Sequence, residues 1–311
     1  MKIAINRKPH SGPWGGGNHF VRAIFDSVCK GNYVSTSLDA DDIDIIFLMD
    51  PRPEGSGFGI NEAISYRQTH PNSRIVQRIN ECDARKNTEH MDSLLLQCSS
   101  FNDYTLFVSN WMREYFKQKG WACQHSSVCY NGVNDEYLSM RKNHDVVRQK
   151  DKKIKVVTHH WSNNLLKGFD VYDFLDYLSV KRDDVEFTYI GRHRGTFKNT
   201  KCIEPLSGRA LAEELSRHDI YFSGSRNDPG PNHILESLAL GIPTYVHSEG
   251  GGCVEFALQG PKDKDKIFSN FVELESIIDF DNHYQNTMIP ETWSHSMTNV
   301  WNVLEKISSK A

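Results

Sequence analysis

Residues 1–133 alternate between short apolar runs and longer segments with helical spacing. Runs such as IDIIFLMD (43–50) are almost continuously apolar, which is typical of strands buried on both faces. Segments such as 110–120 repeat apolar residues at helical intervals and end at a glycine. The order predicts a parallel sheet covered by helices on both faces. We predict strands at 2–6, 43–50, 74–80, 104–109 and 126–133, and helices at 15–31, 61–70, 91–100 and 110–120.

The same alternation returns after a segment that is rich in charge and poor in core-forming residues. We therefore predict two Rossmann-like, doubly wound α/β domains, at 1–140 and 154–288, with a linker at 141–153 and a closing helical segment at 289–311. Ligands of such sheets bind beyond the carboxyl ends of the strands, and two facing domains would form a cleft. In the second half we predict strands at 153–161, 185–191, 219–225 and 243–248, and helices at 169–181, 208–218 and 232–241.

Composition narrows the class of protein. Apolar residues make up 38% of the 311 residues, enough for a sizeable core. The net charge of -4 gives no broad basic surface for nucleic acid, although a local basic patch could still touch a membrane. No apolar run is long enough to span a bilayer, and the N-terminus lacks the layout of a signal peptide. Seven scattered cysteines without a CxxC pair favour a reduced, cytoplasmic protein without structural zinc.

Two carboxylates surround the start of a predicted helix in NDPGPNHILESLALGIP (227–243). Asp228 lies in the loop after a strand, and Glu236 is expected in the first turn, with Asn232 as the helix cap. Backbone N–H groups at such a helix end suit a diphosphate, and an acidic residue there can accept hydrogen bonds from ribose hydroxyls. Acidic residues also simply complement a helix dipole, but that leaves the Pro-Gly-Pro turn and Asp228 unexplained. The helix-end residues of this hypothesis are Asn232, His233 and Ile234.

Two other loops are candidates for ligand contact. Gly16 and Gly17 follow the first strand and would let a ligand approach the backbone, or they form only a tight turn. Their spacing matches neither the GxGxxG pattern nor a P-loop. Lys167 precedes another helix and could neutralise a phosphate, although a single lysine is more often an ordinary surface residue. His159 and His160 are adjacent on a strand, so they should point to opposite faces, which argues against a shared metal.

A D-x-D pattern at Asp42 and Asp44 raises the question of a metal-bound diphosphate. Where this pattern holds a metal on a diphosphate it follows a strand, whereas here it precedes one. We therefore interpret it as a loop and strand start, and we expect no metal and no cofactor.

The stretch DPGPNHILESLALGIP (228–243) resembles the E-P-F-G-x-x-x-x-E and A-x-x-x-G-x-P motifs of family 4 glycosyltransferases, which have the GT-B fold. Asp228 stands for the first Glu of the motif and Glu236 matches the second. Further matches follow in order along nearly the whole chain. They are GGGNHF (15–20), FVSNWMREYF (107–116), VCYNGVNDEYL (128–138), LLKG (165–168), EGGGCVE (249–255) and ETWSHSMTNVWNVLEKI (291–307).

The resemblance implies a retaining, metal-independent hexosyltransferase that uses a nucleotide-diphosphate sugar, with a UDP- or GDP-linked donor expected. Glu236 would bind the donor ribose, Asp228 the sugar ring, and Lys167, helped by His160 or Asn164, the diphosphate. The closing segment would cross back to the first, acceptor-side domain. Other implied donor contacts are Gly16, Gly17, Asn232, His233, Ile234 and, at the base, Ile203; on the acceptor side we name Asn80, Asp83 and Arg85.

The sequence departs from the family at two places. The family usually has an arginine shortly before the Lys167 position, where this chain has His159, His160 and Trp161, and Gly230 replaces the phenylalanine of the motif. A glycan or a lipid-linked molecule would be the acceptor. Two alternatives stay open: a nucleotide-sugar epimerase of the same fold, and a catalytically silent protein that binds a nucleotide sugar.

Overall fold

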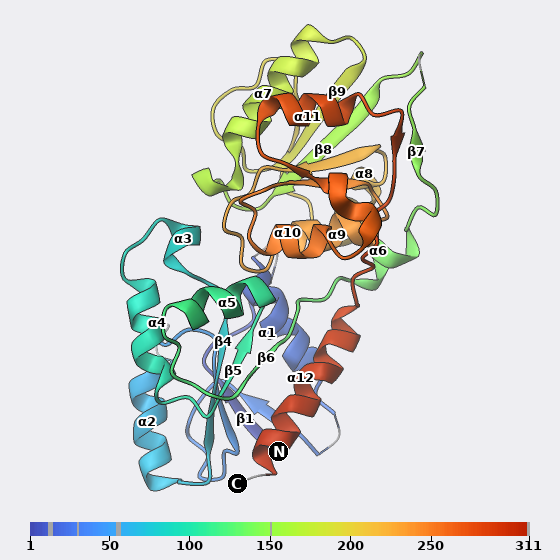
Figure 1. Cartoon of the computed structure of the whole chain (residues 1–311). Helices are drawn as coiled ribbons and strands as arrows, with labels where there is room; N and C mark the ends of the chain where they lie inside the picture. Colours follow the sequence, from blue (N-terminus) through green and yellow to red (C-terminus); the bar gives the residue numbers. More distant parts are fainter. Residues whose placement is uncertain (12–14, 30, 54–56, 150, 310–311) are drawn as a thin grey trace. The chain divides into compact units, whose positions relative to one another are not determined.

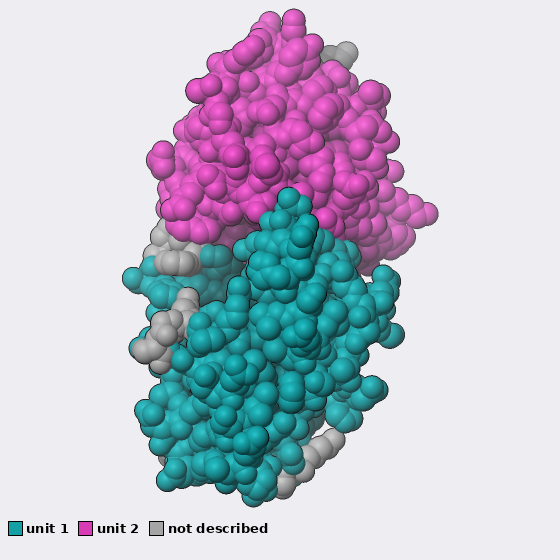
Figure 2. Space-filling view, turned by 90° about the vertical axis from the view of Figure 1, so that its left-hand side faces the viewer, with its two compact units in different colours: residues 1–131, 293–311 teal, residues 132–292 magenta. Residues whose placement is uncertain are grey.

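The computed structural model divides into two compact units, shown in Figures 1 and 2. Unit 1 comprises residues 1–131 and 293–311, and unit 2 comprises residues 132–292. The division at 131 precedes the predicted boundary at 140, and the predicted linker 141–153 lies within unit 2. The structure describes residues 1–11, 15–29, 31–53, 57–149 and 151–309, so the predictions for 15–31, 141–153 and 289–311 include a few positions outside the described residues.

Unit 1 is built on a six-stranded parallel sheet with the strand order β2-β1-β3-β4-β5-β6. Every residue of β3 is buried, as its continuous apolar run predicts. The strands are β1 (Lys2–Ile5), β2 (Tyr33–Ser35), β3 (Ile45–Leu48), β4 (Arg74–Ile79), β5 (Tyr104–Phe107) and β6 (Ser126–Val128). The helices are α1 (Gly16–Asp26), α2 (Ile60–Thr69), α3 (Asp83–Lys86), α4 (Met91–Ser99), α5 (Asn110–Gln118) and α12 (Trp293–Ser308).

The C-terminal helix α12 completes the core of unit 1. It packs beside α1, and its apolar residues Met297, Val300 and Leu304 join Phe20 of α1 in one buried cluster. The indole Nε1 of Trp301 donates a hydrogen bond of 2.9 Å to the Ser27 hydroxyl. The last helix therefore belongs to the same folding unit as the first strand.

Unit 2 has a second six-stranded parallel sheet with the order β10-β9-β8-β11-β12-β13. The chain moves outward from β8 in one direction and then returns to place β11 on the other side, so β8 and β11 flank the topological switch point. The strands are β8 (Ile154–His160), β9 (Val185–Gly191), β10 (Lys201–Ile203), β11 (Ile220–Ser223), β12 (Thr244–His247) and β13 (Ile267–Phe268), and β7 (Val146–Val147) pairs separately with β14 (Asn282–His283). The helices are α6 (Asp135–Ser139), the 3-10 helix η1 (Leu165–Lys167), α7 (Phe169–Lys181), α8 (Gly208–Leu215), α9 (Asn232–Ala239), α10 (Gly252–Ala257), the 3-10 helix η2 (Pro261–Lys266) and α11 (Phe271–Ile278).

The predicted fold class is confirmed, since both units are parallel α/β sheets covered by helices. Among the described residues, no helix combines the length and the apolar character needed to cross a membrane. The structure describes all seven cysteines, and none of them forms a disulfide bond.

Candidate functional site

The candidate site lies at the carboxyl ends of β8 and β11, which are neighbours in the sheet of unit 2. His159 and His160 end β8, and Ser223 ends β11 before the loop that leads into α9. This edge is the switch point of the sheet, where ligands of doubly wound folds bind.

A pair of glycines brings the two loops of this edge into backbone contact. Gly168 has φ +87°, and a Cβ atom there would lie 2.2 Å from the carbonyl oxygen of Gly224. A Cβ on Gly224 would in turn lie 2.8 Å from Cβ of Val171. Only glycine tolerates both the left-handed conformation and this approach. The contact holds the end of η1 against the loop that carries Asp228.

Lys167 and Asp228 meet at this junction. The ammonium Nζ donates to Asp228 Oδ2 over 2.9 Å, and the two side chains are 14% and 7% exposed. The two residues are far apart in sequence, yet the structure brings both predicted phosphate- and sugar-binding groups together. A charge-assisted bond in such a sheltered position fixes both groups. An anionic ligand could take up the ammonium in place of the carboxylate.

Arg226 fixes the loop just before Asp228, and the sequence analysis missed it. Its guanidinium donates two bonds, of 2.8 and 2.7 Å, to the Asp170 carboxylate, and its backbone N–H bonds to the Leu166 carbonyl oxygen. Burial alone would raise the pKa of Asp170, but the Arg226 guanidinium outweighs it and lowers that pKa. Arg226 therefore clamps the Asp228 loop to η1 and α7. The only sequence signal for this ion pair was the acidic residue Asp170, which directly follows Phe169.

Main-chain hydrogen bonds also hold the residues that follow Arg226 in place. Asn227 adopts φ +49°, and the N–H of Asp228 bonds to the carbonyl oxygen of Gly250 at 3.1 Å. The N–H of Gly252 donates back to the Asp228 carbonyl oxygen at 2.8 Å. The glycine segment after β12 thus supports the position of Asp228 through main-chain bonds.

Helix α9 begins at Asn232, the first residue of the predicted range 232–241. Pro231 occupies the cap position and Asn232 is the first helical residue, so the prediction that Asn232 caps the helix is wrong. The first turn contains no acidic residue, so Glu236 lies beyond the predicted first turn. Asn232, His233 and Ile234 form that first turn, as the helix-end hypothesis requires. Proline at the cap follows from the Pro-Gly-Pro turn, which already fixes the entry of the chain.

Glu236 is bonded to His159, a partner that sequence reasoning did not identify. His159 Nε2 lies 2.7 Å from Glu236 Oε2, and the side chains are 8% and 19% exposed. His160, by contrast, is 3% exposed and its Nε2 bonds to the Tyr172 hydroxyl of α7. The adjacent histidines therefore reach different helices, as strand alternation predicts. The Nε2 atom of His160 would therefore reach a ligand only if its bond to Tyr172 opened.

The rings of three histidines lie close together between the parts of the site that hold Glu236 and Asp228. The His233 ring lies 6.2 Å from that of His159 and 4.7 Å from that of His160, measured between centroids. Ligand atoms of His233, Asp228 and Cys253 lie within 4.8 Å of one another, a grouping that could hold a metal ion. The Lys167 ammonium already sits on Asp228, however, and His233 Nε2 bonds to the Ser223 hydroxyl at 2.9 Å. A metal ion in this grouping would therefore share the Asp228 and His233 side chains with Lys167 and Ser223.

The remaining predicted donor contacts occupy separate places. The side chain of Asn164 caps η1 by accepting a 2.8 Å bond from the Leu166 N–H, which holds the lysine loop in shape. Ile203 ends β10, the edge strand two positions from β8. Gly16 and Gly17 open α1 in unit 1, where a Cβ on Gly17 would lie 3.2 Å from Nδ2 of Asn80.

Two of the predicted acceptor-side residues lie on α3 of unit 1. The Asp83 carboxylate accepts bonds from the backbone N–H groups of Met91 and Asp92, at 3.0 and 2.9 Å, so it caps the start of α4. Arg85 is 7% exposed. Asp83 therefore shapes the surface of unit 1 rather than presenting a vacant carboxylate.

No protein-family model matches the sequence, and no curated protein is detectably similar to it. Solved structures do match over the full chain. Sucrose-phosphate synthase from Thermosynechococcus elongatus aligns with a TM-score of 0.62 at 12% identity, over 99% of this chain and 96% of that chain. Anabaena HepE in complex with UDP and glucose aligns with a TM-score of 0.62 at 14% identity, over 100% and 98%.

A third similar structure is an α,α-trehalose-phosphate synthase (UDP-forming) from Burkholderia xenovorans in complex with glucose-6-phosphate. It aligns with a TM-score of 0.58 at 13% identity, over 86% of this chain and 74% of that chain. The chain has the GT-B fold. At these identities the likeness establishes the fold, and the activity has to be argued from the site.

Proposed function

We propose that this protein is a retaining glycosyltransferase of family 4 that transfers a sugar from a nucleotide diphosphate to a glycan or lipid-linked acceptor. The observation that carries the proposal is the convergence of Lys167, Asp228 and Glu236 at the switch point of the second sheet in a GT-B fold. The similar structures crystallised with UDP or UDP-glucose support a nucleotide sugar as the donor.

Each group has a role that its chemistry suits. The diphosphate would lie at the start of α9, where backbone N–H groups and the helix dipole favour negative charge. Lys167 would leave Asp228 for the diphosphate, and the released carboxylate would accept bonds from hydroxyls of the sugar. Glu236 would accept bonds from the ribose, with His159 orienting the carboxylate.

The transfer itself requires stabilisation of the leaving group. The bond between the anomeric carbon and the donor phosphate breaks, and the acceptor oxygen bonds to that carbon on the same face. The acceptor proton passes to the departing phosphate oxygen. Lys167 balances the charge that develops there, which is typically the largest catalytic contribution. Because an ammonium fills this position, we propose that the reaction needs no divalent metal or other cofactor.

Seven cysteines without a disulfide suit a reducing compartment, so we propose that the reaction takes place in the cytoplasm. Peripheral contact with a membrane would there give access to lipid-linked acceptors.

Thermal unfolding with a panel of UDP, GDP, ADP, dTDP and CMP, with and without a chelator, tests the donor site. A ligand that binds only the native state raises the midpoint of unfolding by mass action. We expect one nucleoside diphosphate, UDP or GDP, to raise the midpoint regardless of chelator. Glu236→Ala should abolish that shift, whereas Glu305→Ala on the exposed side of α12 should keep it. Unchanged donor affinity and turnover in Glu236→Ala would refute the site.

The bond between His159 and Glu236 also favours a second candidate, a nucleotide-sugar binding protein without transferase activity. The chain lacks the arginine that the family usually has shortly before the Lys167 position. His159 is already bonded to the Glu236 carboxylate. Donor binding without transfer or donor hydrolysis would support this candidate over the enzyme.

A further inference from the structure

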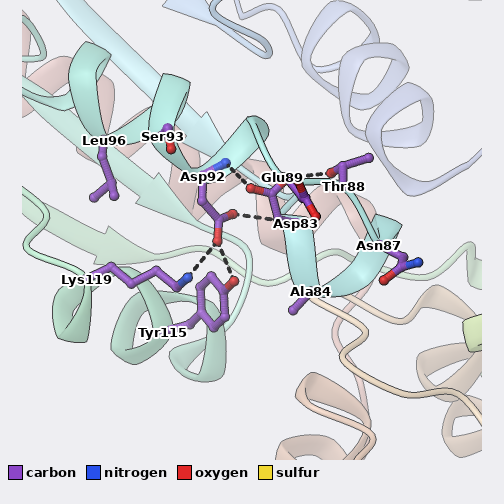
Figure 3. Close-up of a pocket in the computed structure, with 10 residues that line it drawn as sticks. All are labelled: Asp83, Ala84, Asn87, Thr88, Glu89, Asp92, Ser93, Leu96, Tyr115 and Lys119. Carbon is purple, nitrogen blue, oxygen red and sulfur yellow. Dashed lines mark hydrogen bonds and ion pairs between the residues drawn. The ribbon is translucent and has the colours of Figure 1, made fainter.

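Unit 1 contains an open cavity of about 580 Å³, shown in Figure 3. Its walls come from α3, the loop that follows α3, α4 and α5. The volume lies in the range of small-molecule sites, and it is large enough for a few sugar rings.

The floor of the cavity is a fixed pair of carboxylates. The backbone N–H of Asp83 donates to Asp92 Oδ1 over 2.8 Å, and the N–H of Asp92 donates to Asp83 Oδ2 over 2.9 Å. Burial by itself would raise the pKa of Asp83, but the hydrogen bond from the Thr88 hydroxyl and the backbone bonds lower it. Because both carboxylates are held by main-chain bonds, the floor is formed before any ligand enters.

Lys119 places an ammonium group in the lining of the cavity. Lys119 Nζ lies 3.0 Å from Asp92 Oδ2, and the hydroxyl of Tyr115 donates to the same oxygen, so both side chains converge on Asp92 in Figure 3. The ammonium also lies 4.7 Å from the centroid of the Tyr115 ring. Burial and the hydrogen bond to Asp92 raise the pKa of Tyr115 to about 12, so it stays a donor. A ligand amine would have to compete with Lys119 for Asp92.

The charges of the lining disfavour an anionic ligand. Three carboxylates, those of Asp83, Asp92 and Glu89, face one ammonium, that of Lys119. A phosphate or a carboxylate would enter against this excess of negative charge. A neutral ligand that supplies hydrogen-bond donors meets neither obstacle, since it repels no carboxylate and does not displace Lys119 from Asp92.

The rim offers groups that match such a ligand. Asn87, Glu89 and Ser93 are exposed, and within the described residues no hydrogen bond engages their side chains. An amide, a carboxylate and a hydroxyl together can accept from and donate to adjacent hydroxyl groups. Leu96 adds an apolar surface on the wall, against which C–H groups of a sugar ring can pack.

We propose that this cavity binds a neutral, hydroxyl-rich carbohydrate that forms part of the acceptor glycan. Carbohydrate binding follows from the cavity alone, whereas its role as acceptor rests on the proposed glycosyl transfer. Contacts to a part of the acceptor away from the reacting hydroxyl would contribute to its binding.

Ligand-observed NMR of the full chain with maltotriose, cellotriose, N-acetylchitotriose and mannotriose tests the cavity directly. We expect at least one trisaccharide to bind the wild type. Ser93→Trp should fill the cavity and weaken this binding at least tenfold. Ser65→Trp, an exposed serine on α2, is the matched control and should bind as the wild type does. Both variants should keep the unfolding midpoint shift with the nucleoside diphosphate.

The outcomes separate this proposal from the proposed function. If no trisaccharide binds, or if Ser93→Trp binds as tightly as Ser65→Trp, the cavity is not a carbohydrate site, even when the nucleotide shift is present. In another outcome, trisaccharides bind and Ser93→Trp weakens that binding, but no nucleotide shifts the midpoint of thermal unfolding. The carbohydrate site then stands and the transferase proposal fails. With a donor and the bound trisaccharide, Ser93→Trp should raise the acceptor KM about tenfold and leave donor hydrolysis unchanged.

Discussion

The two units carry similar parallel sheets, but the charged pairs at the candidate site of unit 2 and one buried arginine of unit 1 are held in opposite ways. In unit 2, Lys167 is paired with Asp228 and His159 with Glu236. In unit 1, the guanidinium of Arg78 on β4 is 1% exposed and has no carboxylate partner within the described residues. Its Nη2 donates to Asn131 Oδ1 at 2.6 Å, and its carbon Cζ lies 4.1 Å from the centroid of the Phe20 ring.

The paired charges of unit 2 form a preorganised site, whereas the unpaired charge of Arg78 costs stability. Paired charges in unit 2 hold their geometry before a ligand arrives, which is what a binding site needs. Burial lowers the pKa of Arg78 to about 10, which shows that its environment disfavours the charged form. Two of its nitrogens, Nε and Nη1, have no hydrogen-bond partner in the described part of the chain. Changes at the pairs should therefore affect activity, and changes at Arg78 mainly stability.

The largest effect should come from Lys167→Met. Removing the ammonium leaves the departing diphosphate without its balancing charge, so we expect turnover to fall by roughly 100- to 1,000-fold. Steady-state transfer assays with the donor identified by thermal unfolding measure this. Lys155→Met, an exposed lysine on β8, is the control and should stay within about twofold of wild type. A fall of less than about tenfold in Lys167→Met would argue against its role at the phosphate.

Gly168→Ala tests the close approach of the loops. Gly168 in unit 2 and Gly120 in unit 1 both have φ +87°, but a Cβ at Gly120 would meet no atom within 4 Å. We expect Gly120→Ala to cost about 1 kcal/mol of unfolding free energy, from backbone strain alone. Gly168→Ala should cost about 3 kcal/mol because its Cβ also collides with Gly224. Urea unfolding measures both, and equal values would show that the loop contact relaxes without cost.

Acid should weaken unit 2 before unit 1, because burial lowers the pKa values of three of its histidines, His218, His247 and His283. Burial lowers the pKa of His283 to about 4, so the unfolded chain takes up its proton first as the pH falls. Its contribution to stability is complete above about pH 6.5 and is lost progressively towards pH 4, with about 2 kcal/mol lost between pH 7 and pH 5. Burial likewise lowers the pKa values of His218 and His247.

Hydrogen exchange at pH 7 and pH 5, corrected for intrinsic rates, measures the acid effect in each unit. His283→Asn should reduce the loss of protection in unit 2, since asparagine can still bond to the Tyr245 hydroxyl. His125→Asn, an exposed histidine of unit 1, should leave the loss unchanged. Equal acid sensitivity of the two units would contradict the argument from burial.

The smallest effect should come from Arg78→Met. The substitution removes a buried, unpaired charge and fills similar volume, while it leaves the Asn131 amide oxygen without this donor. These contributions oppose each other, so the free energy of unfolding should change by less than about 1 kcal/mol, and donor affinity should not change. A loss of more than about 3 kcal/mol in urea unfolding would show that the guanidinium stabilises unit 1.

The sequence predicts most of the fold because the central strands are continuous apolar runs. β3 and β8 were located from their apolar runs, whereas the short edge strands β2 and β10 were missed because neither forms an apolar run or contains a buried residue. Short edge strands bury too little apolar surface to leave a hydrophobic pattern.

The sequence predicted individual residues of the candidate site, but it did not predict which of them are bonded to each other. Lys167, Asp228 and Glu236 follow from motif positions, yet the partner of Glu236 depends on which of two adjacent histidines faces α9. Strand alternation separates His159 from His160 but cannot say which faces which helix. Arg226 was missed because its partner Asp170 lies far away in sequence and only the fold brings them together. Whether these residues bind the donor stays a prediction.

The return of α12 to unit 1 sets an order of events during protein synthesis. The ribosome releases all of residues 132–292 before Met297, Val300 and Leu304 emerge. The second half of the molecule can therefore close its core while the first half still exposes the apolar surface that α12 will cover. Until the last helix emerges, we expect the nascent first half to be the part of the chain most exposed to aggregation.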